Sequence, residues 1–153
     1  MTKLNLPEYQ FKIQTVENRS QIFDAIRKKY VALTPEEWVR QNFVQYLIHE
    51  KQFPKSLIAI EMEIKYNQMK KRGDVVVYDK SGSPIVMIEC KAPAVKITQD
   101  TFDQIARYNL VLNVKYLIVT NGLDHYCCQM DHQKQSYNFL EEIPKYQQMS
   151  NNQ

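Results

Sequence analysis

The sequence predicts an α/β domain in which a central mixed sheet of about four or five strands is flanked by helices. The hydrophobic pattern changes from a helical to an extended period near residue 57. The runs 75–77 and 85–88 are apolar without alternation, which is typical of strands covered on both faces. A predicted helix separates them from another apolar strand, 116–120, and a crossover of this length allows parallel pairing.

Length and composition indicate one globular domain. We expect it to cover residues 1–153, with its core at about 22–140. The net charge of +3 permits a nucleic-acid partner without requiring one. There is no apolar run of membrane-spanning length and no signal-peptide core, and the 3 cysteines are an odd number, so a reducing cytoplasm is expected. The 3 glycines form no phosphate-binding loop, which excludes the P-loop route of nucleotide hydrolysis.

The N-terminal segment is predicted to form an extended arm or strand over residues 9–16, followed by a helix from Ser20. Arg27 and its two lysine neighbours lie largely off the apolar face of this helix and form a small basic cluster. The cluster is either a solvated surface or a phosphate contact. The apolar face of the helix would consist of Ile22, Phe23, Ile26 and Tyr30.

A second helix has a clear beginning in the sequence. Thr34 suits the N-cap, Pro35 the first helical position, and Glu37 the acid of a capping box. The helix runs to about Glu50. Beyond it, we expect an antiparallel meander of the strands 57–66, 73–79 and 85–91, a helix from 98 or 99 to 112, the strand 116–120, further strands at 125–130 and 137–140, and a frayed polar tail after Pro144.

The end of the third meander strand carries charged side chains that a buried hairpin tolerates only when they are paired or bound to a metal. Glu89 and Lys91 project from one face of the strand, and Cys90 points the other way. The hairpin can bring Asp74 opposite them. Two carboxylates can hold Mg²⁺, and a lysine can orient water or stabilise the charge of a phosphodiester transition state. For an isolated Glu-x-Lys, a structural ion pair would be the better interpretation.

The wider context resembles the PD-(D/E)xK nucleases, and more narrowly the N-terminal nuclease domain of type I restriction enzyme R subunits. The resemblance covers about residues 22 to 140 and implies a restriction-endonuclease-like core. It rests on Arg72-Gly73-Asp74 with the valine strand, Glu89-Cys90-Lys91-Ala92-Pro93, Gln104-Ile105-Ala106-Arg107-Tyr108, the segment 33–41 and the segment 117–122.

The resemblance implies a role for each matching residue. Asp74 and Glu89 would be ligands of Mg²⁺ or Mn²⁺, and Lys91 the catalytic lysine. The Gln-x-x-x-Tyr pattern corresponds to Gln104 and Tyr108, which share a helix face. Without the resemblance, these two would be read as a hydrogen-bonded amide and a half-buried tyrosine. The arginines Arg107, Arg72 and Arg27 are the candidates for nucleic-acid contacts.

Relatives of this kind sometimes take a further metal-ligating acid from the first core helix. Glu37 is the natural candidate and Glu36 the next, although capping already explains Glu37. Glu61 and Glu63 share a strand face and could approach the site, but a solvated sheet face is the simpler interpretation. A zinc site around His125 is disfavoured, because Cys127 and Cys128 face opposite ways on a strand.

The sequence therefore predicts a metal-dependent endonuclease or exonuclease acting on nucleic acid, with DNA as the expected substrate. The resemblance does not extend to a translocase, so a motor or specificity subunit would be a separate chain. The alternatives are a non-catalytic nucleic-acid-binding or assembly module that retains the fold, and a protein-interaction subunit.

Overall fold

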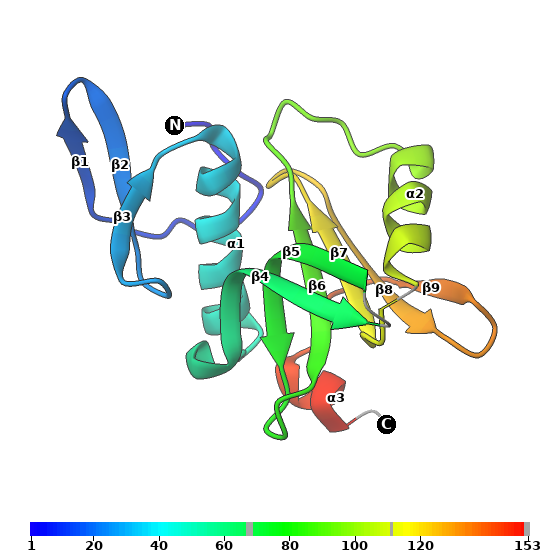
Figure 1. The fold of residues 1–153 in the computed structure, drawn as a ribbon. Coiled ribbons are helices and arrows are strands. Elements are labelled where there is room, and N and C mark those ends of the chain that lie inside the picture. Colours follow the sequence, from blue (N-terminus) through cyan, green and yellow to red (C-terminus); the bar gives the residue numbers. More distant parts are fainter. Residues whose placement is uncertain (67–68, 111, 152–153) are drawn as a thin grey trace.

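The computed structural model describes residues 1–66, 69–110 and 112–151, without the side chains of 61–66 and 69–73. A six-stranded mixed sheet with helices on both faces forms the centre (Figure 1). The α/β prediction is confirmed, and the sheet is larger than the predicted four or five strands. Its strands, in spatial order, are β4 (Ile58–Tyr66), β5 (Met69–Tyr78), β6 (Pro84–Cys90), β7 (Tyr116–Thr120), β8 (His125–Asp131) and β9 (Ser136–Leu140).

The pairing follows the predicted order. β4, β5 and β6 form the antiparallel meander, β6 and β7 are parallel, and β8 and β9 add antiparallel strands. The second meander strand was predicted to begin at residue 73, whereas β5 already begins at Met69 and pairs with β4 from there. Residues 67 and 68 lie outside the described residues. Strand pairing thus extends into polar sequence, because backbone hydrogen bonds do not require apolar side chains.

The segment after residue 12 is a second sheet, and the helix predicted from Ser20 is wrong. β1 (Ile13–Val16), β2 (Arg19–Asp24) and β3 (Lys29–Ala32) form an antiparallel three-stranded sheet. Glu17 and Asn18 both have positive φ, at 52° and 64°, as a two-residue hairpin turn requires. Asp24 accepts the backbone N–H groups of Ile26 and Arg27 and so closes the next turn. The segment therefore forms strands joined by turns, although its apolar residues are spaced as in a helix.

Two helices cover opposite faces of the large sheet (Figure 1). α1 (Pro35–Glu50) begins as predicted, with the Thr34 hydroxyl accepting the Glu37 N–H. It packs on a core that includes Val75 and Ile88. α2 (Gln99–Asn109) packs on a second core with Val76 and Met87. The strands β5 and β6 are therefore covered on both faces, as predicted. Among the described helices, none combines the length and apolar composition that a bilayer crossing needs.

The tail after Pro144 was predicted to fray, and this prediction is wrong. Residues Tyr146–Asn151 form a short helix, α3, in which Tyr146 and Met149 are buried. The Tyr146 hydroxyl donates to the Tyr78 carbonyl at 3.0 Å, and its ring packs edge-on against Phe53 at 5.5 Å. Tyr146 and Met149 therefore dock this polar tail on the α1 side of the core.

Candidate active site

Asp74 lies where the β5–β6 ladder ends. The last residue pair of that ladder is Val75 with Ile88, and the next residues along the two strands are Asp74 and Glu89. The Cys90 N–H donates to Asp74 Oδ2 at 2.8 Å. The carboxylate of Asp74 is thereby held at the backbone of the residue between Glu89 and Lys91.

Glu89 and Lys91 lie together at the carboxyl end of β6. The Lys91 ammonium is 3.8 Å from Glu89 Oε2, and their side chains are 35% and 13% exposed respectively. The Lys91 N–H donates to the Thr120 carbonyl of β7 at 2.8 Å, which continues the parallel ladder to this point. The structure therefore brings Asp74, Glu89 and Lys91 to one place, as the strand alternation predicts.

Cys90 is not a nucleophile in this arrangement. Its side chain is buried in the α1-side core. Burial raises the pKa of the thiol, and the neighbouring carboxylate of Asp74 raises it further. The thiol is therefore protonated and packs as a small apolar group.

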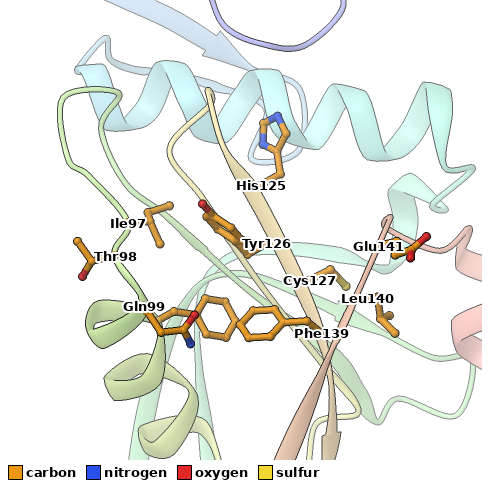
Figure 2. A pocket seen from close by; sticks show the side chains of 10 residues that line it. Ile97, Thr98, Gln99, His125, Tyr126, Cys127, Phe139, Leu140 and Glu141 are labelled. Atoms are coloured by element: carbon orange, nitrogen blue, oxygen red, sulfur yellow. The ribbon is translucent and has the colours of Figure 1, made fainter.

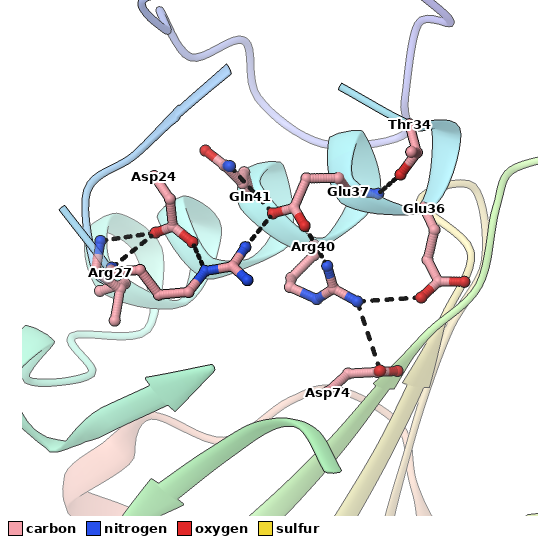
Figure 3. Close-up of polar contacts among 9 residues, drawn as sticks. Asp24, Arg27, Thr34, Glu36, Glu37, Arg40, Gln41 and Asp74 are labelled. Carbon is pink, nitrogen blue, oxygen red and sulfur yellow. Dashed lines mark hydrogen bonds and ion pairs between the residues drawn. The ribbon is translucent and has the colours of Figure 1, made fainter. Parts of the chain in front are cut away.

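Arg40 of α1 is a neighbour of the site that the sequence analysis missed. Its guanidinium is buried, with the residue 4% exposed. Nη2 lies 3.1 Å from Glu36 Oε1 and 3.5 Å from Asp74 Oδ1, and Nη1 contacts Glu37 Oε1 (Figure 3). Burial opposes the charge, but the carboxylates, led by Glu37, overcome this effect and raise the Arg40 pKa. Arg40 lies three residues after Glu37 on a predicted helix, and this spacing could have indicated the Arg40–Glu37 ion pair from the sequence.

Glu37 is the centre of an ionic network and not the acid of a capping box. Its Oε2 accepts hydrogen bonds from Arg27 at 2.9 Å and from Gln41 at 3.1 Å, while Oε1 contacts Arg40. The Thr34 N–H, which a capping box would direct to Glu37, donates instead to the Ala32 carbonyl. Both oxygens of Glu37 are thus bound to cationic or amide groups.

Glu36 is better placed toward the site than Glu37, which was the first candidate for an additional metal ligand. It shares the Arg40 Nη2 with Asp74, and its side chain is 49% exposed. The two carboxylates therefore lie on either side of one cationic nitrogen. A hollow of about 530 Å³ opens beside Glu36, and Thr34, Arg40 and Ala92 also line it.

The remaining candidates lie elsewhere. Gln104, Arg107 and Tyr108 are exposed on α2, with Tyr108 50% exposed. Arg27 binds Asp24 at 2.5 Å as well as Glu37, so its guanidinium joins β2 to α1. The side chains of Arg72, Glu61 and Glu63 lie outside the described residues.

The histidine and cysteines of β8 do not converge. His125 Nδ1 and Nε2 are within hydrogen-bonding distance of Thr120 Oγ1 and the Asn5 carbonyl. Cys127 belongs to the α1-side core and Cys128 to the α2-side core. Within the part of the chain that the structure describes, no group of three or more His, Cys, Asp or Glu side chains could hold a metal ion.

Fold and site together define a mixed α/β domain with two acidic side chains and one lysine at the end of its central hairpin. The sequence matches the family described as the type I restriction enzyme R protein N terminus over residues 35–144, well over half of the chain. The chain belongs to this family. No curated protein matches the sequence.

A solved structure shares the fold. It is a fragment assigned as an HsdR subunit of a type I restriction enzyme from Vibrio vulnificus YJ016, with a TM-score of 0.52 and 18% identity. The similarity covers 76% of this chain and 24% of the other. The chain thus spans about a quarter of that structure.

Proposed function

We propose that this chain is a Mg²⁺- or Mn²⁺-dependent phosphodiesterase that cuts nucleic acid, with DNA as its substrate. The bond from the Cys90 N–H to Asp74 carries the proposal, because it holds one carboxylate beside Glu89 and Lys91. Membership of the R-protein N-terminal family and the resemblance to PD-(D/E)xK nucleases support the same chemistry.

The donor set fits a hard cation. Mg²⁺ is commonly bound by one or two carboxylates while it keeps several waters, and Asp74 and Glu89 would hold it here. When bound, the ion would neutralise phosphate charge and acidify a water molecule. The Cys90 N–H and Arg40 orient Asp74, and the Lys91 ammonium would face the charge that develops on the phosphate.

Cleavage of supercoiled plasmid and of a labelled single strand, with Mg²⁺, Mn²⁺ or EDTA, tests this proposal. Lys91→Ala should reduce cleavage about 100-fold or more while the domain stays folded. Lys80→Ala is the matched control, because Lys80 is exposed in the turn at the other end of the hairpin. Mn²⁺ binding to wild type and to Asp74→Asn gives a second readout. Metal-dependent cleavage that survives in purified Lys91→Ala would overturn the assignment.

A second candidate function is a non-catalytic nucleic-acid-binding or assembly module. The observation that favours it is the Arg40 guanidinium, which already places a cation against Asp74 and Glu36. In that case neither metal binding nor cleavage would be measurable, and oligonucleotide binding would weaken steeply with salt.

A further inference from the structure

An aromatic pocket opens on the α2 side of the large sheet. It has a volume of about 430 Å³ and lies between the beginning of α2 and the strands β8 and β9 (Figure 2). This volume is within the range of about 300–1,000 Å³ typical of small-ligand sites. Phe102, Tyr126 and Phe139 contribute rings to its lining, and Thr98, Gln99 and Glu141 contribute polar groups.

The rings form one cluster that is partly open to solvent. Phe139 packs on Phe102 with centroids 4.7 Å apart, and Tyr126 meets Phe102 edge-on at 6.1 Å. Phe102 is 2% exposed, whereas Tyr126 is 36% and Phe139 47% exposed. A buried ring thus supports two rings that still offer apolar surface. Such surfaces bind flat π-systems without sequence preference.

The strand register places this cluster beside the candidate active site. Glu89 of β6 pairs with Val119 of β7, and Val119 pairs with Tyr126 of β8. Directly paired residues project from the same face of a sheet, and Val119 belongs to the α2-side core. Two strand spacings separate Glu89 from Tyr126, which is about 10 Å. This backbone distance is within the reach of a nucleotide neighbouring a phosphate at Asp74 and Glu89, which would pass over the buried Val119.

The charges around the pocket favour one orientation of a nucleotide. Lys91 and the exposed Lys96 lie on the side of the β6–α2 connection, where they would attract a phosphate backbone. The exposed Glu141 and Glu142 lie on the β9 side and would repel it. The backbone would thus run along the lysine side, and the base would enter between the rings.

We infer that this pocket binds an unpaired nucleobase of the strand whose phosphate is engaged at Asp74 and Glu89. The inference rests on the proposed function and narrows its substrate to single-stranded or locally unpaired nucleic acid. A base in an intact duplex is stacked on its neighbours and has no face available to Tyr126 or Phe139.

Binding without metal tests the pocket separately from cleavage. The probe is a short single-stranded oligodeoxynucleotide with one 2-aminopurine, whose fluorescence is quenched by stacking, measured in EDTA. Its RNA counterpart and its duplex form are measured alongside. Tyr126→Ala and Phe139→Ala should each weaken single-strand binding about 5- to 150-fold and relieve quenching, whereas Tyr126→Phe should retain both.

Tyr30→Ala is the matched control. Tyr30 is 37% exposed and packs edge-on against Phe23, but it belongs to β3 in the other sheet. Its substitution should leave binding unchanged, and melting curves check that each variant is folded. Comparison of the DNA and RNA probes shows which sugar the site prefers.

The outcomes separate the two proposals. Unchanged affinity and quenching in both alanine variants, or equal affinity for duplex and single strand, would overturn the base pocket even if metal-dependent cleavage is found. Base stacking that depends on Tyr126 and Phe139, in a protein that binds no metal and cuts nothing, would support the pocket and reject the nuclease.

Discussion

Replacing Arg40 by methionine should destabilise the domain substantially. The substitution keeps a long apolar stem but removes the cation that Glu37, Glu36 and Asp74 share. Removing one partner of a buried ion pair typically costs about 3–5 kcal/mol, because the remaining charge stays buried. Arg27 still binds Glu37, so the lower end, about 3 kcal/mol, is expected. For a domain of this size, that corresponds to a melting temperature lower by roughly 6–12 °C.

Urea unfolding followed by circular dichroism measures the loss. Arg19→Met is the control: Arg19 is exposed on β2, and its substitution should change the free energy of unfolding by no more than about 0.5 kcal/mol. The double variant with Glu37→Gln should lose less than the sum of the single variants, because both act on one ion pair. A loss below about 1 kcal/mol for Arg40→Met, or strict additivity in the double variant, would refute the network as a source of stability.

Two further predictions concern a turn and a surface pair. Gly122→Ala should destabilise the domain more than Gly82→Ala in thermal melts. Both glycines have φ near +90°, but a Cβ at Gly122 would meet Leu4 Cδ2 at 2.7 Å, whereas a Cβ at Gly82 would meet no atom within 4 Å. Equal losses of stability would contradict the close contact at Gly122. The Tyr137 hydroxyl donates to Asp103, and this bond lowers the Asp103 pKa, while burial and the same bond raise the pKa of Tyr137 to about 12. Stability from Asp103 is present above its ordinary pKa of about 4 and is lost as the pH falls toward the lowered value. Stability also falls between about pH 10 and pH 12, where an unfolded tyrosine ionises and the folded one does not. Asp103→Asn should reduce the loss of unfolding free energy that accompanies a fall in pH below about 4. An unchanged loss at acid pH would exclude the Asp103–Tyr137 pair as its source.

The strands and the charged cluster at their end were accessible from the sequence. Uninterrupted valine and isoleucine runs are typical of buried strands, and a period of two places Glu89 and Lys91 on one face whatever surrounds them. The beginning of α1 was predictable for the same local reason, since a cap depends on residues within one turn. These features depend on near neighbours in the chain.

Other features depended on contacts between distant residues. Arg40 and Asp74 are 34 positions apart, and only the packing of α1 on the sheet brings them together. The sheet of β1, β2 and β3 forms where a helix was predicted, because Asp24 binds backbone N–H groups and residues 17 and 18 adopt positive φ. The spacing of apolar residues gives no information about either feature. Glu89 and Tyr126 lie in line across the sheet only because β6 pairs in parallel with β7, and β7 pairs with β8. The sequence alone determined which residues face the same way along a strand, and the tertiary structure decided which strands and helices stand next to one another.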